Sequence, residues 1–281
     1  MTERMLEFNG VSMCTDSFGN RSDPPVLLIM GATASMLGWP DGFCERLAAA
    51  GRFVIRYDNR DTGRSTTYSP GSANYSLQDM AEDAVGVLDA YELKAAHIVG
   101  MSLGGMIAQI IALQHPDRVL SVAAVASSPV EKEHLDLPGI DDKFSDFFWT
   151  ATTLDWTDED AVVEFMLGRG RLMVGSGHAF NEARARETAV RDFRRAINYQ
   201  SQMNHTLVET GDWRDRVRQI AKPFLVIHGT EDPILPLAHG VALAQRVNGA
   251  SLVTLDGTGH ELHESDWDDI IGALVGHTAP A

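Results

Sequence analysis

Short apolar runs alternate along this chain with segments whose apolar residues recur at helical spacing. Runs such as 26–30 and 120–126 contain few polar positions, which is typical of strands buried on both faces of a parallel sheet. In 77–90 the apolar residues instead fall on one face of a helix. The same patterns predict further strands at 4–8, 11–18, 53–57, 95–99, 224–227 and 251–255, and further helices at 42–50, 106–113, 237–247 and 266–275. Strands that alternate with helices predict an α/β fold, in which helices flank a mostly parallel sheet.

This alternation stops between residues 130 and 215, where helix-like segments occur without a convincing buried strand. We therefore predict a core domain formed by 1–129 and 216–281, and a helical cap formed by the inserted residues 130–215. The insertion is rich in aromatic residues, which we expect mainly in its own core and partly along a pocket. It also carries an arginine cluster, which we expect on a solvated helix face paired with acidic neighbours. The cluster is Arg184, Arg186, Arg191, Arg194 and Arg195, and the acidic neighbours are Glu182, Glu187 and Asp192.

Length and composition fit one large domain with a sizeable core, since the chain has 281 residues of which 44% are hydrophobic. The net charge of −16 disfavours nucleic acid and anionic membranes as partners. No segment resembles a secretory signal, and no run approaches the ~20 apolar residues that cross a bilayer. We therefore expect a cytoplasmic protein that binds neither nucleic acid nor membrane, and a homodimer stays open.

Cysteine and histidine patterns give no support for a metal site. Cys14 and Cys44 do not form a disulfide framework, and we expect free thiols. The spacings typical of zinc ligands do not occur in the sequence. We expect neither a metal nor another cofactor.

Residues 100–104 read G-x-S-x-G between a predicted strand and a predicted helix. In that context Ser102 lies on a sharp turn with its hydroxyl above the sheet. Gly100 and Gly104 fit this turn because side chains there would collide. The pattern alone is common by chance, and an ordinary loop serine is the alternative. The strand–turn–helix context favours a nucleophile.

A serine nucleophile needs a base within hydrogen-bond reach and a carboxylate that orients the base. In this strand order the acid and then the histidine should follow the serine. Asp232 follows a predicted buried strand at the sheet edge where such folds place their sites, with Glu231 as its competitor. His260 follows the last predicted strand, and His263 is its rival. We predict that Ser102, Asp232 and His260 are the catalytic residues.

Acyl transfer also needs hydrogen-bond donors for the developing oxyanion. The backbone N–H groups of Leu103 and Ala32 are the predicted donors, because one follows the nucleophile and the other follows the first buried strand. Methionines adapt to irregular shapes, so a pliable apolar pocket beside the site favours small or medium esters with apolar acyl groups. The predicted substrate-binding residues, for which core packing is the alternative, are Met30, Gly31, Met36, Trp39 and Met101, with Met106 nearby.

The charged segment 56–65 is predicted to be structural. Its Asp, Asn, Thr and Ser side chains can cap backbone groups in a tight loop. Its arginines can pair with Asp58 and Asp61. Substrate binding is the alternative for this segment.

Together these motifs resemble the α/β-hydrolase superfamily over nearly the whole chain. The features are the strand ending at Met30, the 58–65 loop, the 100–104 turn, the 228–232 loop and His260. Residues 28–31, 37–41 and 55–65 are also similar to aclacinomycin methylesterase-like carboxylesterases. That resemblance implies the α/β-hydrolase fold with a helical cap, and the triad Ser102, Asp232 and His260. It further implies cleavage of a methyl ester from a polyketide glycoside.

Many members of the superfamily have His-Gly in the oxyanion turn, whereas this chain has Met30-Gly31, as the closer family does. The expected partners are a small-molecule ester and water, and the expected activity is that of a serine carboxylesterase. A lactonase, a cofactor-free perhydrolase or a carbon–carbon bond hydrolase would use the same triad. A small-molecule receptor that has kept the hydrolase scaffold is the alternative outside catalysis.

Overall fold

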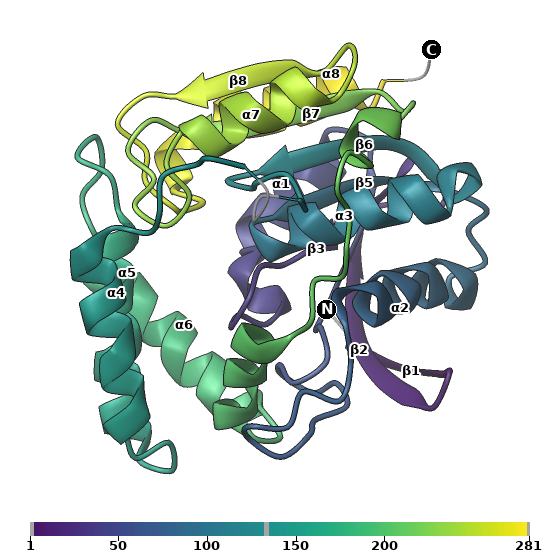
Figure 1. Cartoon of the computed structure of the whole chain (residues 1–281). Helices are drawn as coiled ribbons and strands as arrows, with labels where there is room; N and C mark the ends of the chain where they lie inside the picture. The colour runs from purple at the N-terminus through teal and green to yellow at the C-terminus, as the bar shows by residue number, and fades with distance from the viewer. Residues whose placement is uncertain (1–2, 132–134, 280–281) are drawn as a thin grey trace.

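An eight-stranded sheet forms the centre of the molecule, with strand order β1-β2-β4-β3-β5-β6-β7-β8 (Figure 1). The computed structural model describes residues 3–131 and 135–279. Strands β3 to β8 run parallel, whereas β2 is antiparallel to both β1 and β4. The mostly parallel sheet predicted from the sequence is confirmed. The strands are β1 Arg4–Phe8, β2 Val11–Phe18, β3 Pro25–Ile29, β4 Phe53–Tyr57, β5 Ala96–Met101, β6 Val119–Val125, β7 Phe224–Gly229 and β8 Ser251–Leu255.

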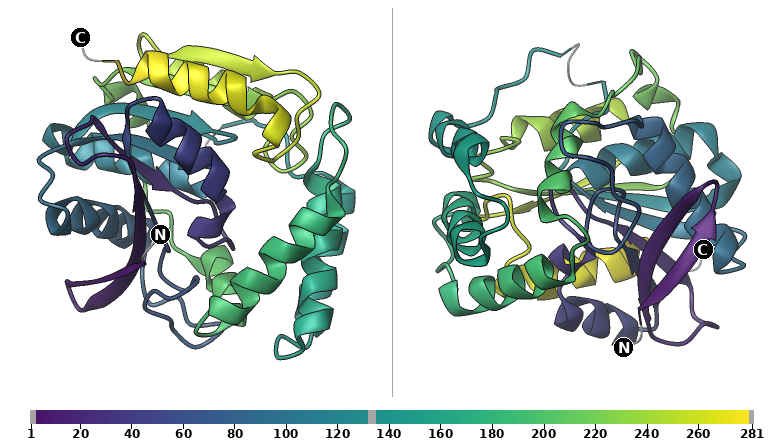
Figure 2. Two further views of the ribbon diagram at one scale, coloured as in Figure 1. Left: turned by 180° about the vertical axis from the view of Figure 1, so that it is seen from behind. Right: turned by 90° about the horizontal axis from the view of Figure 1, so that it is seen from below.

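Helices cover both faces of the sheet (Figure 2). One face packs against α2 (Leu77–Ala90), α3 (Leu103–Gln114) and α7 (Ala238–Arg246). The other packs against α1 (Asp41–Ala49) and α8 (Trp267–His277). The central strands β3 and β5 are therefore apolar along nearly their whole length, because both faces of each strand are buried.

Local sequence signals set the ends of several elements. Asn9 and Gly10, with φ of 50° and 77°, join β1 to β2 in a two-residue turn suited to a hairpin. Ser76 and Asp79 form a capping box at the start of α2, which satisfies backbone donors that a helix leaves free. The predicted range 77–90 therefore coincides with this helix.

The long connection between β6 and β7 holds helices that stand beside the sheet rather than on its faces (Figures 1 and 2). They are α4 (Asp142–Trp149), α5 (Glu159–Met173) and α6 (Glu182–Arg195), followed by the 3-10 segment η5 (Tyr199–Leu207). Trp156, Phe165 and Tyr199 form a small core of their own among them. Val130 and Trp213, near the two ends of the predicted cap, pack in the main core.

The structure bears on two further features of the sequence, namely membrane-spanning segments and the two cysteine thiols. Among residues 3–131 and 135–279, no helix is both long and apolar enough to cross a membrane. Cys14 and Cys44 are free and buried. Burial raises the pKa of each thiol to about 12, so both are protonated at neutral pH and poorly reactive.

Candidate active site

Ser102 lies between β5 and α3 on a sharply turned backbone. Its φ of 53° and ψ of −120° place a non-glycine residue in a region that side chains rarely adopt. A Cβ on Gly100 would lie 2.1 Å from the Gly104 carbonyl oxygen, and a Cβ on Gly104 would lie 2.2 Å from that of Ile29. Glycine is therefore required at both positions. The Ser102 N–H donates to the Val125 carbonyl at 2.9 Å, which ties the turn to β6.

Asp232 follows β7 and is held by backbone donors. Its Oδ1 accepts hydrogen bonds from the N–H groups of Ile234 and Leu235, both at 2.8 Å. Its Oδ2 accepts from His260 Nδ1 at 2.7 Å. Both side chains are buried. The bond places the His260 proton on Nδ1 and leaves Nε2 free to accept one.

Charge and hydrogen bonding favour the ionised form of Asp232. Burial alone would raise the pKa of this carboxyl, but the electrostatic interaction with the His260 ring and the hydrogen bonds outweigh it and lower the pKa. His228 Nε2 donates to the Leu235 carbonyl at 2.7 Å and lies 3.5 Å from Asp232 Oδ2. Burial lowers the pKa of His228, which favours its neutral form. Asp232 is thus suited to hold a histidine ring in one orientation.

The two rival residues have other partners. Exposed Glu231 accepts hydrogen bonds from the N–H and hydroxyl of Ser176, both at 2.6 Å. The ring of His263 stacks on His178, with ring centroids 3.9 Å apart. The structure therefore brings Asp232, rather than Glu231, to His260.

The loop that carries His260 packs tightly against the end of α5. The His260 N–H donates to the Met173 carbonyl at 2.9 Å. A Cβ on Gly259 would lie 1.9 Å from the same oxygen. On the core side, a Cβ on Gly229 would lie 2.3 Å from the Thr258 carbonyl oxygen. Close backbone approaches on two sides thus fix this loop, and Gly259 is required for one of them.

The turn after β3 lies against Ser102. A Cβ on Gly31 would lie 3.0 Å from Ser102 Cβ and 3.6 Å from its Oγ. Neither the Ala32 N–H nor the Leu103 N–H donates a hydrogen bond to another described residue. Both predicted donors are therefore free to bind an oxyanion beside Ser102.

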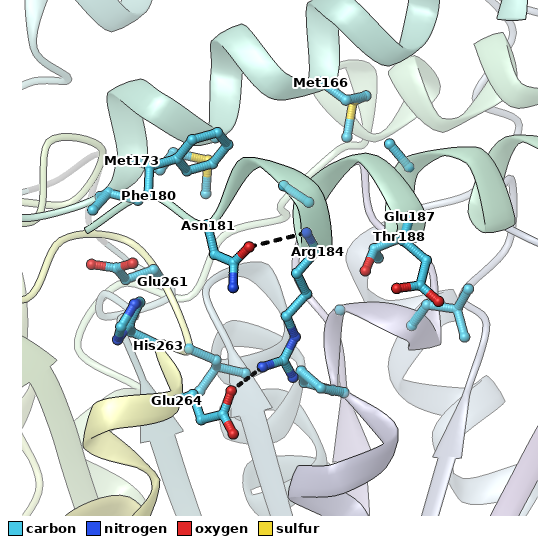
Figure 3. A pocket seen from close by; sticks show the side chains of 18 of the residues that line it. Met166, Met173, Phe180, Asn181, Arg184, Glu187, Thr188, Glu261, His263 and Glu264 are labelled. Atoms are coloured by element: carbon cyan, nitrogen blue, oxygen red, sulfur yellow. Dashed lines mark hydrogen bonds and ion pairs between the residues drawn. The ribbon is translucent and has the colours of Figure 1, made fainter. Parts of the chain in front are cut away.

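A cavity of about 930 Å³ is lined in part by His260 and by Met101, the residue before Ser102, whereas Ser102, Ala32 and Leu103 are not among its lining residues (Figure 3). Met30, Met101 and His260 line it from the core domain. The long β6–β7 connection contributes Met166, Met173 and Phe180 to its apolar lining. Charged residues also line it, among them Arg184 and Glu264, which form an ion pair.

A sequence model of the alpha/beta hydrolase fold matches residues 24–266. The chain belongs to the alpha/beta hydrolase family. Rhodomycin D methylesterase of Streptomyces sp. (strain C5) is 33% identical to this hydrolase, covering 100% of this chain and 99% of that protein. The rhodomycin D methylesterase of Streptomyces peucetius is 31% identical with the same coverage. The resemblance to methylesterases expected from the sequence is therefore confirmed.

Solved structures agree on the fold of this alpha/beta hydrolase. A hydrolase from Pseudomonas aeruginosa PA01 superimposes with a TM-score of 0.75 at 24% identity, covering 99% of this chain and 98% of that one. The enol-lactonase of Burkholderia xenovorans LB400 gives a TM-score of 0.77 at 22% identity, with 98% and 99% covered. At these identities the likeness shows the fold alone.

Two of the predicted pocket residues are buried among core side chains of the hydrolase. Met36 and Trp39 are fully buried, and Trp39 packs on Phe43 with ring centroids 5.5 Å apart. The chain turns inward there because the Met36 N–H donates to Asp58 Oδ1 at 2.9 Å. Gly31 is also absent from the described cavity lining, whereas Met30 and Met101 belong to it. Neither Met36 nor Trp39 is among the residues that line the cavity, and substrate binding by these two stays a prediction.

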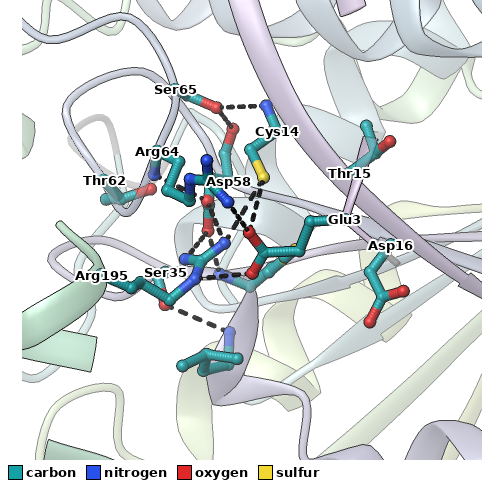
Figure 4. A network of polar contacts seen from close by, with 12 residues as sticks. Glu3, Cys14, Thr15, Asp16, Ser35, Asp58, Thr62, Arg64, Ser65 and Arg195 are labelled. Carbon is teal, nitrogen blue, oxygen red and sulfur yellow. Dashed lines mark hydrogen bonds and ion pairs between the residues drawn. The ribbon is translucent and has the colours of Figure 1, made fainter. Parts of the chain in front are cut away.

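The 56–65 loop is built of structural contacts, but their partners differ from those expected. Asp58 pairs with Arg195 of α6 at 2.8 Å (Figure 4). Arg60 pairs with Asp83 of α2 at 2.6 Å. Asp61 accepts a hydrogen bond from the Tyr75 hydroxyl at 2.7 Å. The arginine side chains of the loop therefore pair with other elements, whereas Asp58 accepts the backbone N–H of Arg64 at 3.0 Å.

The arginine cluster of α6 is only partly a solvated face. Arg194 is 67% exposed and pairs with Glu159, as a surface arginine would. Arg195 is only 10% exposed and bridges Asp58 and Glu3 (Figure 4). Asp192 of the same helix is buried and accepts a hydrogen bond from the Ser35 hydroxyl at 2.6 Å. The expectation that Asp192 pairs with the arginines on a solvated face was wrong.

Proposed function

We propose that the protein is a serine carboxylic ester hydrolase that acts through an acyl-enzyme. One observation carries the proposal, namely the Asp232–His260 pair at the sheet edge that also holds Ser102 on a strained turn. Strain of this kind is typical of residues whose position is set by function. The free N–H groups of Ala32 and Leu103 supply the remaining part of an acyl-transfer site.

His260 takes the proton of Ser102 as Oγ attacks the ester carbonyl carbon. The Ala32 and Leu103 N–H groups stabilise the negative charge on the carbonyl oxygen. Asp232 keeps the proton of the neutral ring on Nδ1 and stabilises the imidazolium that forms. His260 then protonates the leaving alcohol. Water attacks the acyl-enzyme with the same assistance, which releases the carboxylic acid and frees Ser102.

A methyl ester with a sizeable apolar acyl part is the substrate class that we favour. The proteins similar over the full chain carry the name methylesterase. The cavity of about 930 Å³ is at the upper end of the ~300–1,000 Å³ usual for ligand pockets. Methionine and phenylalanine side chains in its lining suit an apolar acyl group.

The test of the mechanism is pre-steady-state hydrolysis of p-nitrophenyl butyrate. We expect a burst of p-nitrophenol equal to the concentration of active sites, followed by slower turnover. The Ser102→Ala variant should lose the burst and turn over at least about 1,000-fold more slowly. Asp232→Asn should lower kcat by about 10⁴-fold, because the ring is then held in the wrong tautomer.

Glu231→Gln is the matched control, since it neutralises the adjacent carboxylate and should leave kcat within about twofold. Near-normal hydrolysis by the Ser102→Ala variant would refute the assignment of Ser102 as the nucleophile. A larger loss of kcat in Glu231→Gln than in Asp232→Asn would refute the assignment of Asp232 as the carboxylate that orients His260. A panel of esters that varies the acyl and alcohol parts independently, with lactones included, then identifies the preferred substrate. A preference for lactones would overturn the proposal that the substrate is a methyl ester.

A further inference from the structure

The oxyanion turn, residues 31–36, contains a second strained residue. Thr33 has a φ of 55°, in the left-handed region that β-branched residues rarely adopt. A conformation of this kind persists only where surrounding contacts hold it. Thr33 directly follows Ala32, whose N–H is the proposed oxyanion donor. The contacts that hold Thr33 therefore bear on the geometry of that donor.

His205, from η5, makes the contact to the Thr33 backbone. Its Nδ1 accepts the Thr33 N–H at 3.0 Å, and its Nε2 donates to the Arg60 carbonyl at 2.7 Å. These bonds define one tautomer, with the proton on Nε2 and a lone pair on Nδ1. His205 is buried, and burial lowers its pKa, which favours this neutral form.

Two more side chains from the long connection between β6 and β7 bind the oxyanion turn. Arg169 of α5 donates from Nη1 to the Thr33 carbonyl at 3.2 Å and to its hydroxyl at 3.0 Å. Asp192 of α6 accepts the Ser35 hydroxyl at 2.6 Å. The oxyanion turn is thus held by three elements that follow β6, and Arg195 supports its far end through Asp58 (Figure 4).

We propose that His205 is a positioning residue, which aims the Ala32 N–H at the oxyanion by fixing the peptide plane that follows it. Arg169 fixes the other side of Thr33. Both residues lie in the long connection between β6 and β7. Packing of that connection against the core therefore completes the oxyanion hole. The proposal rests on the proposed function and adds a second role to these helices, besides enclosing the cavity.

Two substitutions at His205 separate its two hydrogen bonds. In His205→Asn the amide oxygen reaches about as far as Nδ1 and can still accept the Thr33 N–H. In His205→Gln the longer side chain reaches Arg60 and leaves the Thr33 N–H buried without an acceptor. We expect His205→Gln to lower kcat about 10- to 100-fold with KM within about threefold, because a displaced donor retains part of an effect worth about 10²- to 10³-fold. His205→Asn should keep kcat within about threefold.

A transition-state analogue provides a readout that a purely structural role would not change. A trifluoromethyl ketone adds to Ser102 and places an oxyanion in the hole. Its inhibition constant should rise in His205→Gln by the same factor by which kcat/KM falls, while that of the carboxylic acid product stays constant. Arg169→Met should shift both quantities in the same direction by a smaller factor, about three- to tenfold, and keeps the test available if His205→Gln does not fold.

His97→Gln is the matched control. His97 is also a buried histidine, bound through Nδ1 to the Ser121 hydroxyl at 2.8 Å, but it lies at the start of β5, the far end from Ser102. This variant should lose stability without losing kcat. Equal losses of kcat in His205→Asn and His205→Gln, or an unchanged inhibition constant of the ketone in His205→Gln, would overturn the proposal. Labelling of wild-type Ser102 by a fluorophosphonate tests the proposed function separately, because its absence would refute the nucleophile whatever His205 does.

Discussion

The strain at Ser102 predicts that the protein is more stable when this proposed nucleophile is replaced by glycine than when it is replaced by alanine. Glycine adopts positive φ without a steric penalty, whereas serine at φ 53° and ψ −120° does not. Ser102→Ala is the matched comparison, because alanine also lacks the hydroxyl but keeps the Cβ that causes the strain. Both variants should be inactive, and they should differ in stability.

The expected magnitude follows from two opposing effects. A residue in this backbone region is strained by about 1–3 kcal/mol. Glycine costs about 0.5–1 kcal/mol through the greater freedom of the unfolded chain. The free energy of unfolding of Ser102→Gly should therefore exceed that of Ser102→Ala by up to about 2.5 kcal/mol. For a chain of 281 residues this corresponds to a rise in Tm of up to about 4 °C.

Urea unfolding followed by circular dichroism measures the difference, and thermal unfolding under the same conditions checks its sign. The m-values of the two variants should agree, so that a change in midpoint reflects stability alone. If Ser102→Gly is less stable than Ser102→Ala by the usual cost of glycine, the turn stores no strain, and the reasoning fails.

Two further predictions concern α6. Arg195→Met should lower the free energy of unfolding measured in urea by about 3–5 kcal/mol, because it leaves the fully buried Asp58 carboxylate without its cation. The control Arg194→Met removes an exposed arginine and should lower it by less than about 1 kcal/mol. Equal effects of the two substitutions would contradict this prediction. Burial raises the pKa of Asp192 from 3.8 to about 6, so the native state binds that proton more tightly than the unfolded chain does and loses stability as the pH rises between these values. Relative to wild type, Asp192→Asn should therefore gain up to about 3 kcal/mol between pH 4 and 7, and a pH-independent difference would refute the shift.

The residues proposed for catalysis could be found from sequence because each follows a strand. Ser102, Asp232 and His260 lie just beyond the carboxyl ends of β5, β7 and β8. Parallel strands bring these ends to one edge of the sheet, so strand prediction alone places them together. Glycines next to two of them mark backbone approaches that allow no side chain, and this signal is also local.

The supporting residues could not be found in the same way. His205 and Thr33 are 172 positions apart, and Arg169 and Asp192 reach the same turn from different helices. Their positions depend on how the helical connection docks, which helical periodicity does not specify. Asp192 reads as a polar residue of an amphipathic helix, and only the docked structure shows that this face is buried. Met36 and Trp39 are fully buried, and this too is hard to predict, because an inward turn of the backbone has no simple sequence signal.

The attachment of the helices between β6 and β7 bears on how enzymes of this kind diverge. Their contacts reach the oxyanion turn at Thr33 and the histidine loop at the Met173 carbonyl, and Val130 and Trp213 at their flanks are part of the main core. Exchange of the whole segment between homologues would thus remove the contacts that hold the proposed catalytic site along with the walls of the cavity. Side chains such as Met166 and Phe180 face the cavity without being among these contacts. A lineage could therefore acquire new substrates more easily by point substitution at such positions than by recombination of entire caps.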